Sequence, residues 1–141
     1  MKINITVNGK YHLELSDSDF MDIVSFLSNR PNDAAFYDVL SNHPASRVRA
    51  VVASKSFLPL STYHKLADDP CLEVVQYLAS NSAALRQFDT STVRKLIDRD
   101  VSIAVEMAFT HINELQPSIR TSTKKYLKSH PDPAVRIALE Q

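Results

Sequence analysis

The stretch LADDPCLEVVQYLAS, residues 66 to 80, has apolar residues at helical spacing on both sides of an Asp-Pro pair. Proline lacks an amide hydrogen, and its ring disfavours the helical conformation of the residue before it, so a single continuous helix is disfavoured here. The pattern therefore predicts two separate helices, over about 60–68 and 71–80, that meet at an angle with Pro70 at the corner.

This unit recurs along the chain, and its copies align without gaps. Segments 39–54, 65–80 and 126–141 share a leucine, a proline four residues later and a valine after four more, whereas segment 95–110 has Asp100 in the proline column. The residues expected to cap the second helices are Asn42 or His43, Asp68 or Asp69, Asp100, and Ser129 or His130. Neither helix of a unit can bury its apolar stripe alone. The repeats therefore predict a mainly α fold, a short α-α superhelix or α-solenoid.

The N-terminus follows a different pattern, in which apolar and polar residues alternate over 3–7 and 11–15 on either side of Asn8-Gly9. Asn-Gly favours a type I′ turn, so residues 1–15 are predicted to form a β-hairpin cap whose apolar face packs on a helix. A helix capped within 16–19 should follow and end before Pro31. The helical repeat domain is predicted over 16–141, with units at about 36–58, 60–82, 90–113 and 117–141.

Several residue pairs occur at the spacing of a known repeat. They are Val52-Ala53, Pro59-Leu60, Leu66-Ala67 and Asp69-Pro70, with Val48-Arg49 and Val135-Arg136 in the first and last units. In these residues the chain resembles the leucine-rich repeat variant family over about 36–141. The resemblance implies a right-handed superhelix of short paired helices, similar to HEAT and armadillo repeats, with no catalytic activity in the repeats. One branch of that family carries a cysteine-ligated iron–sulfur module, which a chain with one cysteine cannot hold.

Composition argues against several functional classes. The 16 basic and 16 acidic side chains balance, so no overall charge attracts nucleic acid or anionic lipid. Cys71 is the only cysteine, the five histidines lack metal-ligand spacing, and one glycine leaves no Gly-rich phosphate loop. No run approaches the roughly 18 apolar residues of a membrane span. We therefore expect a cytoplasmic protein without enzymatic activity, cofactor, metal or membrane span.

His43 and His130 occupy the same column, directly before proline. A pH-sensitive or metal-sensitive corner is one interpretation of this pair. Ordinary residues at a helix start are the other, and the sequence favours it because isolated histidines are weak signals of a site.

The second helices of stacked repeats usually line the inner face, so their polar positions form the predicted surface for binding another protein. The predicted partner-binding residues are Arg47, Arg49, Glu73, Gln76, Tyr77, Glu106 and Arg136. Tyrosine is a frequent anchor of protein interfaces, which gives Tyr77 particular interest. The leading hypothesis is a non-enzymatic protein–protein interaction module.

A basic cluster on one predicted helix supports an alternative hypothesis, a HEAT-like protein that binds nucleic acid. The cluster consists of Arg120, Lys124, Lys125 and Lys128. Such residues can contact phosphates, but the sequence favours a solvated helix surface, because four charges without interleaved glycine or aromatic residues are a weak signal of nucleic-acid binding.

The two ends of the chain differ in charge, which suggests self-association. Residues 1–46 carry six acidic and three basic side chains, whereas 117–141 carry two acidic and five basic. The last predicted helix is rich in apolar residues over 134–139, and no polar capping repeat follows it in the sequence. We therefore expect this helix to pair with a second copy or with a partner.

Overall fold

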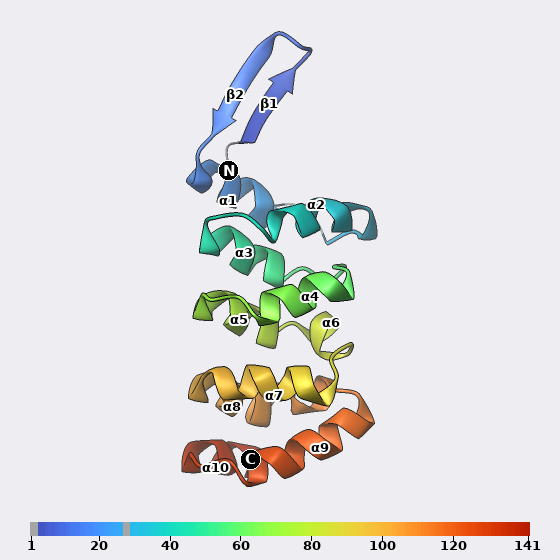
Figure 1. Ribbon diagram of the computed structural model, residues 1–141, viewed down its shortest axis with the longest axis vertical. Helices are drawn as coiled ribbons and strands as arrows, with labels where there is room; N and C mark the ends of the chain where they lie inside the picture. Colours follow the sequence, from blue (N-terminus) through green and yellow to red (C-terminus); the bar gives the residue numbers. More distant parts are fainter. Residues whose placement is uncertain (1–2, 27–28) are drawn as a thin grey trace.

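The computed structural model describes residues 3–26 and 29–141, and this part of the chain is mainly helical with a two-stranded hairpin at its N-terminus (Figure 1). Within these residues, no helix is both long enough and apolar enough to cross a membrane. The mainly α prediction with an N-terminal hairpin is confirmed at this level.

Strands β1 (Ile3–Val7) and β2 (Tyr11–Leu15) pair antiparallel, with Ile5 opposite Leu13. Asn8, Gly9 and Lys10 connect them, since Val7 pairs with Tyr11, and Asn8 and Gly9 have φ values of 53° and 66°. Both central residues of a type I′ turn need positive φ, which asparagine and glycine adopt at low cost. The predicted positive φ values at Asn8-Gly9 are therefore confirmed, and they account for the only glycine of the chain, while Lys10 is one residue more than a two-residue turn contains.

The prediction that the hairpin packs on a helix is wrong. Tyr11 is 71% exposed and Leu13 is 58% exposed, and the hairpin stands away from the helices beyond α1 (Asp17–Phe26) (Figure 1). Leu15, at the junction with α1, does pack against the core. Next to it, the Ser16 N–H and hydroxyl donate to the Asp19 carboxylate, and the Asp19 N–H donates back to the hydroxyl, so these two residues cap the start of α1.

Eight helices form four pairs, each with a short corner inside the pair. Two separate helices flank Pro70, as predicted. The pairs are α2 (Ala34–Leu40) with α3 (Ser46–Ala53), α4 (Leu60–Ala67) with α5 (Leu72–Ala79), α7 (Thr90–Arg99) with α8 (Val101–Glu106), and α9 (Pro117–Lys128) with α10 (Pro133–Glu140).

The pairs stack along the long axis of the molecule (Figure 1). Helix α3 packs against α1 and α5, α7 packs against α4 and α9, and α10 packs against α8. First helices thus contact first helices in the last three pairs, and second helices contact second helices between the first and second pairs and between the third and fourth. Phe20 near one end and Ala138 near the other belong to one buried apolar cluster.

Four short elements interrupt the regular pattern. They are the 3-10 helix η1 (Pro31–Asp33), the one-turn helix α6 (Ser82–Leu85), and the π-helix η2 (Met107–His111) with the 3-10 helix η3 (Ile112–Glu114). Asn81 caps α6 by accepting from the N–H groups of Ala83 and Ala84, and its amide donates to the carbonyls of Ala53 and Lys55. One side chain thus anchors the inserted turn to the end of α3, in the first unit.

The predicted helix caps before each column proline are wrong, since the second helices begin two residues after the proline and have Ala45, Cys71 and Asp132 as N-caps. The residue before each proline instead bridges the corner. It accepts the N–H two residues ahead: His43 Nδ1 from Ala45 (3.1 Å), Asp69 Oδ1 from Cys71 (2.9 Å), and His130 Nδ1 from Asp132 (3.1 Å). Asp100, in the unit without the proline, caps α8 as predicted by accepting from the Ser102 N–H.

A guanidinium group binds the two carbonyls at each proline corner. Arg49 Nη1 donates to the carbonyls of His43 (2.8 Å) and Pro44 (3.0 Å). The last unit repeats this arrangement, with Arg136 donating to His130 and Pro131. The second unit has Val75 in the arginine column. There Arg99, from α7 of the next unit, donates to the carbonyls of Asp69 (2.8 Å) and Pro70 (2.9 Å).

Arg49 also joins the first unit to the second. Its Nε and Nη2 atoms donate to the two carboxylate oxygens of Asp69, at 2.7 and 3.1 Å, and the side chains are only 14% and 6% exposed. Burial acts to raise the pKa of Asp69, but the bonds from Arg49 and from the Cys71 N–H bring this pKa below its ordinary value.

Replacing Arg49 with methionine should destabilise the fold by about 3 kcal/mol, because it leaves the buried Asp69 carboxylate without its countercharge. Urea unfolding measures the loss. Arg47→Met, at an exposed position of the same helix, is the matched control and should cost far less. Adding Asp69→Asn to Arg49→Met should restore part of the stability, because the buried charge is then removed. Equal losses for the Arg49 and Arg47 variants would contradict this role.

His43 is buried in the first corner, with 1% of its surface exposed. Its ring stacks on Phe20 with centroids 5.5 Å apart, and its Nε2 lies 3.5 Å from the Asp17 carboxylate. Burial lowers the pKa of His43 below its ordinary value, although Asp17 acts in the opposite direction.

Stability should therefore fall as the pH drops below about 6.5, the ordinary pKa of histidine. The unfolded chain takes up a proton there while folded His43 stays neutral, and above this pH the contribution of His43 is constant. The pH dependence of the unfolding free energy tests this. His43→Asn, whose oxygen can still accept the Ala45 N–H, should flatten the slope between pH 5 and 7. His12→Asn, on the exposed hairpin, should leave the slope unchanged; an unchanged slope in His43→Asn would refute the assignment.

Candidate protein-interaction surface

Three of the predicted partner-binding residues lie together on the second-helix side. Gln76 and Tyr77 of α5 and Glu106 of α8 line a hollow of about 310 Å³, together with Ser80. Tyr77 is 47% exposed. The hollow thus combines an exposed aromatic ring with amide, hydroxyl and carboxylate groups.

The helical period of α5 determines which side chains face this hollow. Val74, Val75 and Leu78 are fully buried in the core, so the intervening positions turn outward. Gln76 Nε2 donates to the Ser102 hydroxyl of α8 at 3.3 Å, and this bond joins the two helices that form the hollow. The hollow therefore lies between helices of successive units that a side-chain hydrogen bond connects.

The other predicted partner-binding residues lie elsewhere. Arg49 and Arg136 bind corner carbonyls, which gives them a structural task that their sequence positions alone do not reveal. Glu73 is exposed on the first turn of α5. Arg47 lines a separate hollow of about 430 Å³ against α1, whose acidic lining residues are Asp17 and Asp22.

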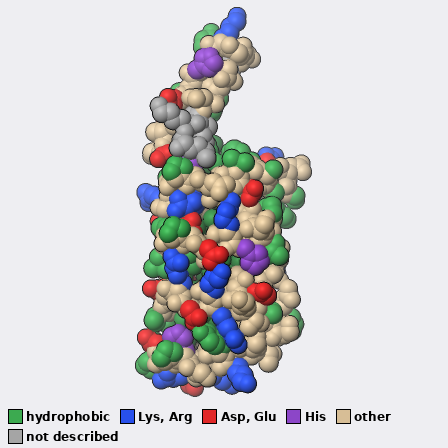
Figure 2. All heavy atoms as spheres, viewed as in Figure 1, with side chains coloured by type: hydrophobic (Ala, Val, Ile, Leu, Met, Phe, Trp, Pro, Cys, Tyr) green, Lys and Arg blue, Asp and Glu red, His purple; other side chains and the backbone are tan. Residues whose placement is uncertain are grey.

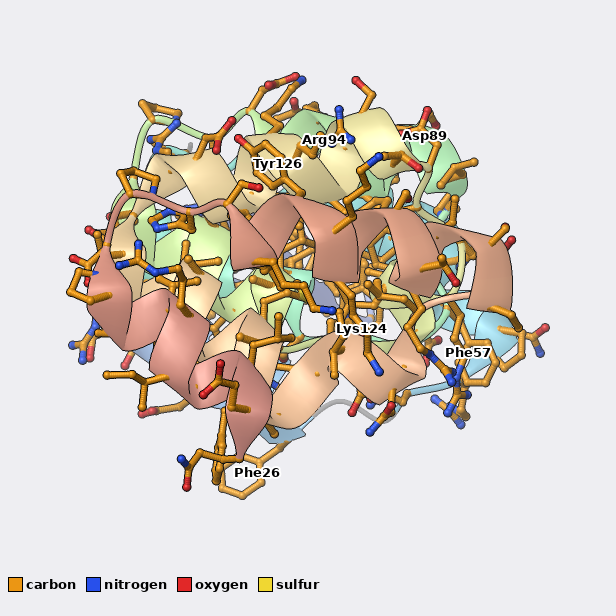
Figure 3. All side chains as sticks on the ribbon, turned by 90° about the horizontal axis from the view of Figure 1, so that it is seen from below. Phe26, Phe57, Asp89, Arg94, Lys124 and Tyr126 are labelled. Atoms are coloured by element: carbon orange, nitrogen blue, oxygen red, sulfur yellow. The ribbon has the colours of Figure 1, made fainter. Side chains whose placement is uncertain are left out.

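The basic cluster of α9 divides into two parts. Arg120 turns toward the preceding loop, where its Nη2 donates to the carbonyls of Asn113 (2.7 Å) and Leu115 (3.2 Å). Lys124, Lys125 and Lys128 are exposed. Figure 3 looks onto this end of the molecule and has Lys124 near the centre of the view. The cluster therefore offers three lysines to a ligand.

The sequence did not predict a hollow of about 690 Å³ along α7, lined by Thr90, Ser91, Arg94, Lys95, Asp98 and Arg99. Its charges are bound internally. The Arg94 guanidinium lies 4.9 Å from the centroid of the Tyr126 ring, and Figure 3 shows the two side chains next to each other. The Tyr126 hydroxyl donates to the Asp98 carboxylate at 2.5 Å, and this bond raises the pKa of Tyr126. Lys95 pairs with Asp68 at 2.8 Å. The α7 side in Figure 2 accordingly has cations and carboxylates intermixed.

Within residues 3–26 and 29–141, no group of three histidine, cysteine, aspartate or glutamate side chains is arranged to hold a metal ion. Cys71 is a half-buried free thiol at the N-cap of α5. The adjacent carboxylates Asp68 and Asp69 each bind a cation, since Asp69 binds Arg49 and Asp68 binds Lys95.

Comparison with protein-family models, with curated proteins and with solved structures finds no match. The hollow on α5 and α8 is therefore interpreted from this chain alone. It remains the surface in which the most predicted partner-binding residues come together.

Proposed function

We propose that this protein is a non-enzymatic interaction module that binds another protein through its second-helix face. The observation that carries the proposal is Tyr77, which is 47% exposed in a hollow with Gln76, Ser80 and Glu106 around it. An aromatic ring surrounded by hydrogen-bonding groups is typical of an interface anchor with its polar rim.

We further propose that the stacked pairs form a short α-solenoid of the HEAT or armadillo type, related to the leucine-rich repeat variant family. The recurring proline corner and the contacts between equivalent helices of successive pairs support this architecture. In such architectures each unit contacts only its neighbours, and the stacked helices form an extended binding surface.

Nucleic-acid binding has a weaker basis. The Arg120 guanidinium donates hydrogen bonds to two backbone carbonyls, so three exposed lysines of the predicted cluster remain for a ligand. The cations along α7 are paired with neighbouring groups. A binding site for nucleic acid needs several cations free to neutralise phosphates, so we favour a protein partner.

A photo-reactive phenylalanine analogue at position 77 should cross-link to one discrete protein partner in the native cell. The same analogue at Ser91, exposed on α7, should not capture that partner and serves as the matched control. Tyr77→Ala should weaken binding of the partner by about 30-fold, the loss of about 2 kcal/mol expected for an anchor residue. Calorimetry with the purified partner measures this, and far-UV circular dichroism verifies the fold. Equal capture from both positions, or unchanged affinity in Tyr77→Ala, would refute the proposal.

A further inference from the structure

The two ends of the stack carry opposite charge. At the N-terminal end, the carboxylate of Asp17 is 62% exposed and Asp22 is exposed as well. Asp19 is engaged with Ser16 in the cap of α1. At the other end, Lys124, Lys125 and Lys128 are exposed on α9. The sequence has the same asymmetry. Residues 1–46 carry six acidic and three basic side chains, whereas residues 117–141 carry two acidic and five basic ones.

Both ends also expose apolar side chains. On the hairpin, Ile5 is 39% exposed, Leu13 58% and Tyr11 71%. On α10, Ile137 is 58% exposed. A two-stranded hairpin is only marginally stable in water by itself, so covering its apolar face would stabilise it.

Arg136 gives the C-terminal end a specific binding group. Like Arg49, it donates through Nη1 to the two corner carbonyls. Arg49 uses its remaining Nε and Nη2 groups to bind the Asp69 carboxylate of the next unit. The corresponding groups of Arg136 have no hydrogen-bond partner in the part of the chain that the structure describes. The contact between Arg49 and the Asp69 carboxylate is therefore an example, within this fold, of how Arg136 can bind a carboxylate.

We propose that this protein associates head to tail, so that the α9–α10 end of one copy binds the α1 and hairpin end of a second copy. Arg136 and the α9 lysines pair with Asp17 and Asp22 of the next copy, and its hairpin covers Ile137. The two surfaces lie at opposite ends of the long axis (Figure 1). A contact of this kind does not close on itself, so it adds copies in a row. The proposal goes beyond the partner-binding hollow and does not depend on it.

The test measures the mass of the full chain by sedimentation velocity as concentration increases. The average mass should rise past that of a dimer at low ionic strength, and high salt should weaken the association because exposed charges are screened. A monomer at every concentration would overturn the proposal. A mass that stops at a dimer would also overturn it, because a symmetric contact would then be present.

Two charge-reversed variants test the polarity of the contact. Asp17→Lys with Asp22→Lys blocks the N-terminal end, and Lys124→Glu with Arg136→Glu blocks the C-terminal end. Each variant alone should associate at least about tenfold more weakly than the unaltered chain, because several ion pairs become repulsive. An equal mixture should associate again, because the unaltered end of one variant binds the unaltered end of the other and the two reversed ends now carry opposite charges. Association of each variant as strong as that of the unaltered chain, or a mixture that stays monomeric, would overturn the proposal.

Two controls separate this contact from other effects. Arg86→Glu reverses an exposed charge in the middle of the stack and should leave the association unchanged. Tyr77→Ala should also leave it unchanged, so failure of the partner-binding proposal would be distinguished from failure of this one. Circular dichroism and urea unfolding establish that every variant is folded. Loss of association in Arg86→Glu or Tyr77→Ala would overturn the assignment to the ends.

Discussion

Hydrogen bonds from guanidinium groups to the carbonyls at the proline corners are the interaction on which this architecture depends. The last carbonyls of a helix lack intrahelical donors. Many helices satisfy them by ending in a left-handed residue, commonly glycine. In the described chain only Asn8 and Gly9 have positive φ, and both belong to the hairpin turn. At the proline corners, backbone N–H groups just past each helix serve instead, as in the bonds from His43 to Leu40 and from His130 to Leu127. Arg49, Arg99 and Arg136 then bind the two carbonyls that follow through charged hydrogen bonds, which are stronger than neutral ones.

The internal bonds of the arginines and lysines also decide which charges remain available on the surface. Arg49 and Arg99 bind the carbonyls of the proline corners, while Arg94 and Lys95 bind groups of neighbouring helices. Such bonds tie each layer to the next and neutralise the side formed by the first helices. Other charged side chains, such as Arg47, Glu73 and Arg86, stay exposed.

The sequence predicted features whose causes are local. Asn8-Gly9 specified the hairpin turn, and Pro70 with its repeats specified the corners, because both act through the φ values of one or two residues. Features that depend on distant contacts were missed. Nothing near Arg49 in the sequence reveals that its partner is Asp69, and the helix starts were misplaced because Asp69 and His43 bridge the proline. For the candidate site, the helical period placed Tyr77 and Gln76 on one face, but whether Glu106 joins them depends on the stacking of α8 on α5.

The second corner connects three successive units. Arg49 of the first unit holds the Asp69 carboxylate, and Arg99 of the third holds the carbonyls of Asp69 and Pro70. In a stack where each unit contacts only its neighbours, a residue bonded from both sides couples units that would otherwise be independent. The Tyr77 hollow is formed by α5, which follows this corner, and by α8 of the third unit. Arg99 directly precedes the cap of α8, so both helices that line the hollow begin next to this corner.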